Sequence, residues 1–294
     1  MNENQGTQSK TIAQALQSAA QSIIETQQTN AKLEAEILLA FVLGKPRTHF
    51  YTWPEECLEE GTLNQFSIAV QRRCAGEPIA YITGTREFWG LPLKVTPDTL
   101  IPRPETERLV EIALEHIPED RPSLIADLGT GSGAIALAIA SERTQATIVA
   151  SDANESTLEV AKINCADLKL TNISFLHGHW FDAFEKRSDE PHAFNLIISN
   201  PPYVAEQDPH LQQGDLRFEP QQALSSGPDG LQDIREIISK SREHLESGGY
   251  LLLEHGADQA DRVIDLFEKS GYSRVQCFRD YAERERATIG CWLK

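Results

Sequence analysis

The chain contains 294 residues, 40% hydrophobic and 24% charged, a composition typical of globular proteins that excludes a fibrous repeat or a wholly disordered chain. At roughly 150 residues per domain, this length predicts two domains. The 27 basic and 44 acidic residues give a net charge of −17. Because such a surface repels phosphate backbones, we expect no direct nucleic-acid binding.

Three further features bear on where the chain works. Residues 1–10 are polar and lack an apolar core after a basic start, which predicts a disordered tail and not a secretory signal. No apolar stretch approaches the ~20 residues needed to cross a membrane. The five cysteines are widely spaced and form no CxxC pair, so we expect free thiols and no metal site. Together these features predict a cytoplasmic protein, and we expect it to be a monomer.

Residues 11–77 carry apolar side chains at helical spacing and predict a small helical bundle. Thr11 and Gln14 have the spacing of a capping box at the start of the first helix. A second helix is expected to begin after Asn30 and to end at Gly44, and a third to run from about Thr62 to position 76.

Residues 78–104 predict a β-hairpin followed by a stiff linker. Ile79 and Tyr81 alternate as in a strand, residues 83–85 offer a turn, and apolar residues at 91, 93 and 95 form the second strand. Prolines at 97, 102 and 104 forbid regular structure in the segment that follows. A helix is then expected over residues 105–116.

The remainder of the chain alternates short apolar runs with helical patterns, which predicts an α/β domain with a twisted, mainly parallel sheet. Only a polar turn separates the last two apolar runs, so these should pair antiparallel. The expected strands are residues 124–127, 147–151, 173–176, 196–199, 250–254, 274–278 and 287–293.

A glycine-rich turn joins the first of these strands to an apolar helix. Glycine lets a backbone approach a ligand closely and leaves the N–H groups at the helix start free to bind an anion. Asp152, at the end of the second strand, can accept both hydroxyls of a ribose. The turn also fits the dinucleotide fingerprint, so it leaves nicotinamide and S-adenosylmethionine open as cofactors. Its residues are Gly129, Thr130, Gly131, Ser132 and Gly133.

The segment Asn200-Pro201-Pro202-Tyr203 follows the strand at 196–199 and should reach the same sheet edge. The Asn200 side-chain oxygen and the Pro201 carbonyl match the two donors of a planar NH2 group. Tyr203 is placed to supply a ring beside that group. Such a clamp orients an amide nitrogen toward an electrophile such as an S-methyl sulfonium, which favours methyl transfer over hydride transfer.

The sequence resembles the protein-(glutamine-N5) methyltransferases, specifically the release factor glutamine methyltransferases of the HemK/PrmC type, over nearly its whole length. The turn at residues 283–287 departs from the family pattern, so the resemblance implies no role for it. The motifs that carry the resemblance are PIAYITG at 78–84, EFWG at 87–90, IPRPETE at 101–107, DLGTGSG at 127–133, NPPY at 200–203, FEP at 218–220 and LEHG at 253–256.

The resemblance implies a helical domain over residues 11–77 that recognises the substrate, a hairpin and proline-rich linker over 78–104, and a Rossmann-like class I methyltransferase domain over 105–294. That domain would bind S-adenosylmethionine and release S-adenosylhomocysteine, with residues 129–133 facing the methionine, Asp152 the ribose and Trp180 the adenine.

The implied reaction is methylation of the side-chain amide nitrogen of the glutamine in the Gly-Gly-Gln tripeptide of peptide chain release factors. Asn200, Pro201 and Tyr203 would be catalytic, and Asn200 would also face the cofactor. The substrate glutamine would contact the Asn-Pro-Pro-Tyr segment and a loop that closes over the pocket. The residues implied for substrate binding are Asn200, Pro201, Pro202, Tyr203, Arg103, Glu105 and Thr106.

Three other functions stay open at this stage. Methylation of a glutamine in a ribosomal protein would use the same clamp. N6-adenine methylation of DNA uses similar motifs because adenine N6 is also a planar amine, although the net charge argues against a duplex partner. A binding protein that senses S-adenosylmethionine without catalysis could keep the same fold.

Overall fold

The computed structural model describes residues 10–26, 30–185 and 193–294. The chain divides into two compact units, Met1–Gly84 and Thr85–Lys294. The first nine residues, most of the segment expected to be a disordered tail, lie outside the described residues. In the described part of the chain, no helix has the length and apolarity that a membrane span needs.

The first unit is helical, as predicted. Thr11 and Gln14 form the capping box, with the Gln14 N–H donating to the Thr11 hydroxyl at 3.3 Å. The second helix ends at Gly44 in the left-handed conformation, also as predicted. Apolar side chains from all five helices of this unit meet in one core. The helices are α1 (Ile12–Ile24), α2 (Ala31–Leu43), α3 (Thr48–Thr52), α4 (Glu60–Cys74) and α5 (Ile79–Thr83).

Two expectations for this region were wrong. Residues 48–52 form the short helix α3, for which no helix was expected. Ile79 and Tyr81 lie in helix α5 and not in a strand. Ile79 and Ile82, three residues apart, both pack on the helical core, and this helical spacing outweighs the alternation over so short a run.

The hairpin begins after this helix. Its strands are β1 (Thr85–Phe88) and β2 (Leu91–Lys94), paired antiparallel from Phe88↔Leu91 to Thr85↔Lys94. The turn is therefore Trp89-Gly90 and not residues 83–85, and both of its residues have positive φ, which suits the twist of a two-residue hairpin.

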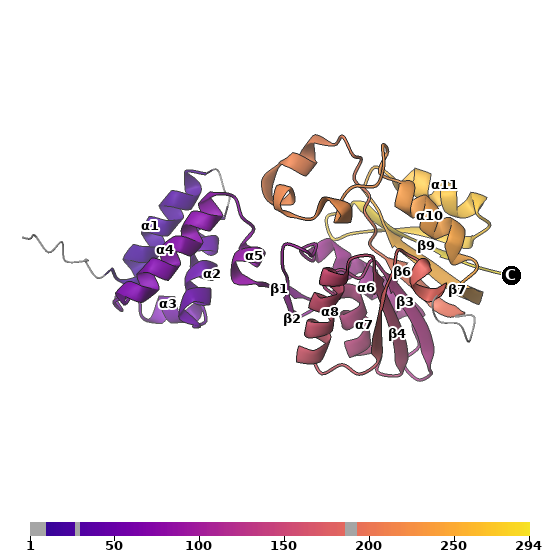
Figure 1. Cartoon of the computed structure of the whole chain (residues 1–294), viewed down its shortest axis with the longest axis horizontal. Helices are drawn as coiled ribbons and strands as arrows, with labels where there is room; N and C mark the ends of the chain where they lie inside the picture. The colour runs from indigo at the N-terminus through magenta and orange to yellow at the C-terminus, as the bar shows by residue number, and fades with distance from the viewer. Residues whose placement is uncertain (1–9, 27–29, 186–192) are drawn as a thin grey trace, which may run out of the picture. The chain divides into compact units, whose positions relative to one another are not determined.

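A seven-stranded sheet forms the centre of the second unit, and all seven predicted strands are present (Figure 1). The strand order is β5-β4-β3-β6-β7-β9-β8, in which the first five are parallel and β9 runs antiparallel to both of its neighbours, β7 and β8. The strands are β3 (Ser123–Leu128), β4 (Ala146–Asp152), β5 (Ile173–His177), β6 (Phe194–Ser199), β7 (Leu245–Glu254), β8 (Ser273–Arg279) and β9 (Glu285–Cys291).

Helices cover both faces of this sheet. One buried apolar cluster contains side chains of α6, α7 and α8, and the other contains side chains of α9, α10 and α11. A single 3₁₀ turn, Pro104–Thr106, precedes α6, so the helix expected from residue 105 begins two residues later. The helices are α6 (Glu107–His116), α7 (Ala134–Glu142), α8 (Glu155–Asp167), α9 (Asp182–Glu185), α10 (Gln232–Ser241) and α11 (Ala260–Lys269).

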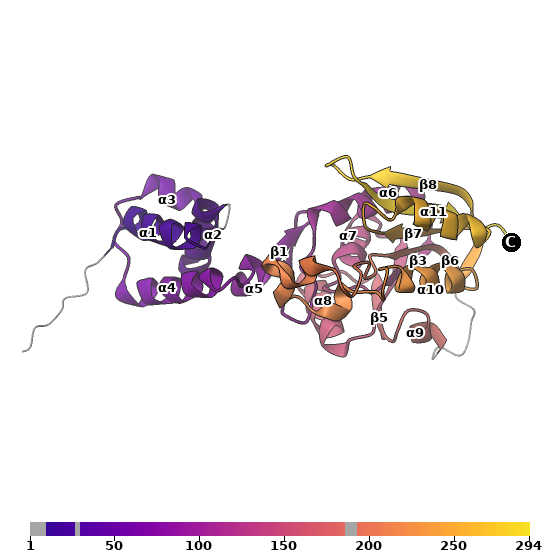
Figure 2. The same cartoon turned by 90° about the horizontal axis from the view of Figure 1, so that it is seen from above.

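The carboxyl ends of the parallel strands form the edge of the sheet at which the site lies. Register pairs Leu128 with both Ser151 and Ser199, and Ser199 with Leu253, so the carboxyl ends of β3, β4, β6 and β7 meet at one edge. Parallel α/β sheets bind ligands at this edge. The outer strands of the sheet are β5 and β8; β8 is the long yellow arrow in Figure 2, and its pairing with β9 is interrupted by two irregularities.

Candidate active site

A cavity of about 430 Å³ opens at the carboxyl ends of these strands, within the second unit. Its volume lies in the range of small-molecule sites. Gly133, Pro201, Tyr203 and Glu105 are not among its described lining residues. The predicted site residues that line it are Gly129, Thr130, Gly131, Ser132, Asp152, Trp180, Asn200, Pro202, Arg103 and Thr106.

The glycine-rich turn gives one wall of the cavity. A Cβ on Gly129 would lie 3.0 Å from the Trp180 ring, and φ at Gly129 is +70°, so both space and backbone require glycine. Gly133 serves packing instead, because a Cβ there would lie 2.8 Å from Leu137 of α7. Within the turn, Gly129 therefore faces the cavity, whereas Gly133 allows the following helix to pack closely.

Asp152 ends β4 opposite this turn. Its carboxylate accepts hydrogen bonds from the backbone N–H groups of Gly131, at 3.0 Å, and Asn154, at 2.9 Å. Burial raises the pKa of Asp152, and these hydrogen bonds oppose that shift. The Ala153 N–H also bonds this carboxylate, and since a carboxylate has about four acceptor positions, acceptor capacity remains for a hydroxyl group in the cavity.

Trp180 is buried beside Gly129 and is held in place from its other side. Its indole Nε1 donates to the Asp233 carboxylate at 3.1 Å. Asp233 also lines the cavity. Sequence reasoning missed Asp233 because it lies in the first turn of α10, where an acidic residue is common for reasons of helix electrostatics.

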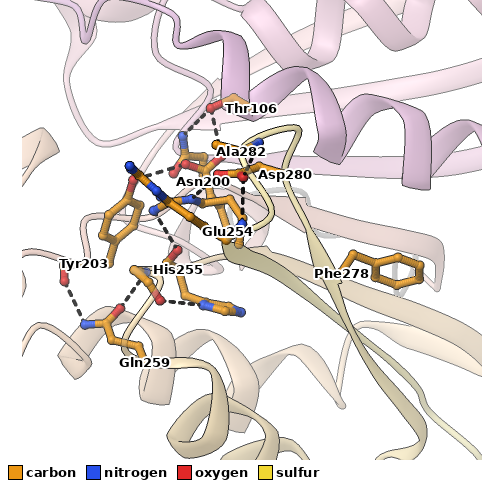
Figure 3. Close-up of polar contacts among 12 residues, drawn as sticks. Thr106, Asn200, Tyr203, Glu254, His255, Gln259, Phe278, Asp280 and Ala282 are labelled. Carbon is orange, nitrogen blue, oxygen red and sulfur yellow. Dashed lines mark hydrogen bonds and ion pairs between the residues drawn. The ribbon is translucent and has the colours of Figure 1, made fainter.

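Asn200 follows β6 and its side chain is fixed by hydrogen bonding. Its Nδ2 donates to the Thr106 hydroxyl at 3.2 Å, and that hydroxyl donates to Glu254 at 2.8 Å (Figure 3). Among the described residues, none donates to the Asn200 side-chain oxygen. The oxygen expected to accept from a substrate is therefore available.

Tyr203 lies to the left of Glu254 in Figure 3. Its hydroxyl donates to the Glu254 carboxylate at 3.2 Å, and burial raises its pKa above the ordinary range of tyrosine. The ring was expected beside a substrate amine. The Tyr203 hydroxyl is engaged with Glu254 and its ring packs on one of the two apolar clusters of the sheet, so the place of the ring beside a substrate amine stays a prediction.

The segment around Arg103 covers part of the cavity and is tied down by Glu219. This buried carboxylate accepts from the Arg103 guanidinium and, at 3.1 Å, from the Ile101 N–H. Glu105 is exposed. Glu219 belongs to the FEP stretch, which sequence reasoning noted without assigning it a role.

The donor set of the cavity suits S-adenosylmethionine. The remaining acceptor capacity of Asp152 matches a ribose hydroxyl, the Trp180 ring matches a flat base, and the absence of a Cβ at Gly129 leaves that ring its place. Among the described residues, no group of three His, Cys, Asp or Glu side chains could hold a metal ion. The fold and this site define a class I methyltransferase that uses S-adenosylmethionine.

Comparison with known proteins identifies the family. Residues 14–84 match the family model "PrmC N-terminal domain", and residues 108–222 match "Methyltransferase small domain". The release factor glutamine methyltransferase of Aliivibrio fischeri is 45% identical over 97% of this chain and 99% of its own length, and that of Escherichia coli is 49% identical over 87% and 91%. The chain belongs to the release factor glutamine methyltransferase family.

The solved structures support the fold independently of sequence. A methyltransferase from Pyrococcus furiosus superposes with a TM-score of 0.52 at 18% identity, and the match covers 78% of this chain and 100% of that one. At this level of identity the likeness concerns the fold alone.

Proposed function

We propose that the chain transfers a methyl group from S-adenosylmethionine to the side-chain amide nitrogen of the glutamine in the Gly-Gly-Gln tripeptide of class 1 peptide chain release factors. The observation that carries this proposal is the orientation of the Asn200 amide. Its nitrogen is engaged by Thr106, and its oxygen stays available as an acceptor where Asn200 lines the cavity.

The clamp explains why an amide could react. An amide nitrogen is a poor nucleophile because its lone pair is delocalised, and a primary amide presents two N–H donors. The Asn200 oxygen and the Pro201 carbonyl would hold these two donors, with Pro202 fixing the backbone within the motif. Fixing both hydrogens positions the nitrogen for attack.

The cofactor supplies the activated methyl group when it is bound. Residues 129–133, Asp152 and Trp180 would hold it, and Asn200 would contact both cofactor and substrate. Arg103, Glu105 and Thr106 belong to the loop that would close over the glutamine. Tyr203, held by Glu254, would fix the far end of the clamp motif.

We further infer that the helical segment 11–77 recognises the release factor and that the chain acts as a cytoplasmic monomer without binding nucleic acid. The net charge of −17 supports the last point, and it also disfavours DNA adenine methylation. A glutamine of a ribosomal protein presents the same NH2 group, and the assay below distinguishes the two protein substrates.

The test is tandem mass spectrometry of a release factor incubated with the purified chain and S-adenosylmethionine, with a mixture of ribosomal proteins in a parallel reaction. One added methyl group on the Gly-Gly-Gln glutamine is expected. Asn200→Ala should abolish the transfer while cofactor binding, measured by calorimetry, is retained. A methyl group on another residue, or on the ribosomal proteins alone, would contradict the proposal.

A further inference from the structure

We propose that Glu254 is a positioning residue which, through the Thr106 hydroxyl, determines which end of the Asn200 side-chain amide faces the substrate. This inference rests on the proposed function, because it concerns the same clamp. Thr106 was expected among the substrate-binding residues. In this proposal its role is to orient the Asn200 side chain.

The fold brings the three residues together from distant parts of the chain. Asn200 and Glu254 each follow a residue of the register pair Ser199↔Leu253, so they are neighbours at the ends of the parallel strands β6 and β7. Thr106 ends the 3₁₀ turn before α6 and is 148 residues from Glu254 in sequence. All three belong to the second unit.

The directions of the hydrogen bonds follow from the chemistry of the groups. An ionised carboxylate has no proton to donate, so the single Thr106 proton must point at Glu254. The Thr106 oxygen can then only accept, and the group of Asn200 that faces it must be the NH2. While Glu254 is ionised, this network allows only one orientation of the amide. The Asn200 oxygen is thereby turned away from Thr106.

The same carboxylate also holds the other end of the motif. Glu254 is buried, and its second oxygen accepts from the Tyr203 hydroxyl at 3.2 Å. The Tyr203 carbonyl accepts from the Gln259 side chain at 2.9 Å. A Cβ on Gly230 would lie 2.3 Å from that carbonyl, so the backbone of the motif is closely packed. The side-chain amide of Asn200 could by itself adopt two orientations, and the hydrogen bonds from Glu254 through Thr106 select one of them.

This orientation of the Asn200 amide requires the ionised form of Glu254. Facing it are the hydroxyls of Thr106 and Tyr203, the Arg286 guanidinium of β9, and the more distant Glu105. Burial raises the pKa of Glu254 to about 7, while the two hydroxyls and Arg286 oppose that shift. A protonated Glu254 could donate to Thr106, which could then donate to the Asn200 oxygen and reverse the amide.

The test compares Thr106→Val, which keeps the shape and removes the hydroxyl, with Thr106→Ser, which keeps the hydroxyl. A reversed amide would present donors to donors, so kcat for a release factor should fall about tenfold or more in Thr106→Val. The Kd for S-adenosylmethionine should stay within about twofold. Thr106→Ser should recover most of kcat. Ser241→Ala, which removes a buried hydroxyl hydrogen bond in α10, is the matched control and should keep kcat.

Glu254→Leu provides the second arm, because it removes the acceptor and frees the Thr106 proton. In a double-mutant cycle, Thr106→Val should add little to Glu254→Leu, since both break one chain of hydrogen bonds. Additive losses would overturn the proposal, as would an unchanged kcat in Thr106→Val.

A readout independent of the substrate separates this inference from the proposed function. The Asn200 side-chain NH2 signal, assigned by its loss in Asn200→Asp, should exchange slowly with solvent in the wild type and faster in Thr106→Val. If the wild type transfers no methyl to a release factor, the proposed function fails, and this exchange measurement still decides the role of Thr106. Equal exchange in both proteins would overturn it.

Discussion

Stability at different pH values tests the environment of Asp127. This side chain is fully buried at the end of β3. One carboxylate oxygen accepts from the Thr130 hydroxyl at 2.6 Å, and the Ala136 N–H also favours the charged form, although the second oxygen has no hydrogen bond of ordinary geometry among the described residues. Burial therefore dominates and raises the pKa of Asp127 from 3.8 to about 7.

The sign of the effect follows from where the proton is held. The folded chain keeps the Asp127 proton up to about pH 7, whereas the unfolded chain releases it near pH 4. Between these values the folded state binds more protons, so the free energy of unfolding falls as the pH rises. A shift of about three pKa units corresponds to about 4 kcal/mol as an upper limit. Glu254, with its pKa raised to about 7, contributes with the same sign.

Urea denaturation of the wild type and of Asp127→Asn at pH 5 and pH 8 isolates the contribution of Asp127. Only about two of the three pKa units lie between pH 5 and the folded-state pKa, so the wild type should lose up to about 3 kcal/mol more than the variant over this interval. Asp120→Asn, which removes an exposed carboxylate, is the control and should follow the wild type. If Asp127→Asn lost as much stability as the wild type, the assigned burial effect would be refuted.

Two other substitutions test the walls of the cavity. Gly129→Ala should weaken S-adenosylmethionine binding about tenfold or more, because its Cβ meets Trp180 and its φ is positive; an unchanged Kd by calorimetry would count against this placement. Glu219→Gln removes the charge that holds Arg103, so hydrogen exchange of residues 101–103 should accelerate while the exchange of β3 stays constant. Equal exchange in that loop would show that Glu219 does not restrain it.

Sequence reasoning succeeded where the signal is local. The capping box at Thr11 and the glycine at the end of α2 each depend on residues a few positions apart, and the buried strands of a parallel sheet are continuous apolar runs. It failed at residues 79–83 because five residues are too few to separate a helical from a strand period.

The cavity was predictable in its main walls and not in its supports. Strand ends of a parallel sheet share one edge, so the sequence could bring the glycine-rich turn, Asp152 and Asn200 together. The Thr106–Glu254 and Trp180–Asp233 hydrogen bonds join residues far apart in sequence, and no local sequence pattern predicts such contacts. Polar residues of these types are common at helix starts and strand ends without any such partner.

The outer strand β8 bears on whether the protein self-associates at high concentration. An open strand with free backbone groups can recruit the same strand of another molecule, and proteins avoid this with bulges and charged side chains. Strand β8 has both, because its ladder is twice interrupted and Arg274 and Arg279 lie along it, the former with a positive φ. Straightening this strand by replacing its arginines with valine should therefore promote self-association, visible by light scattering, without touching the cavity.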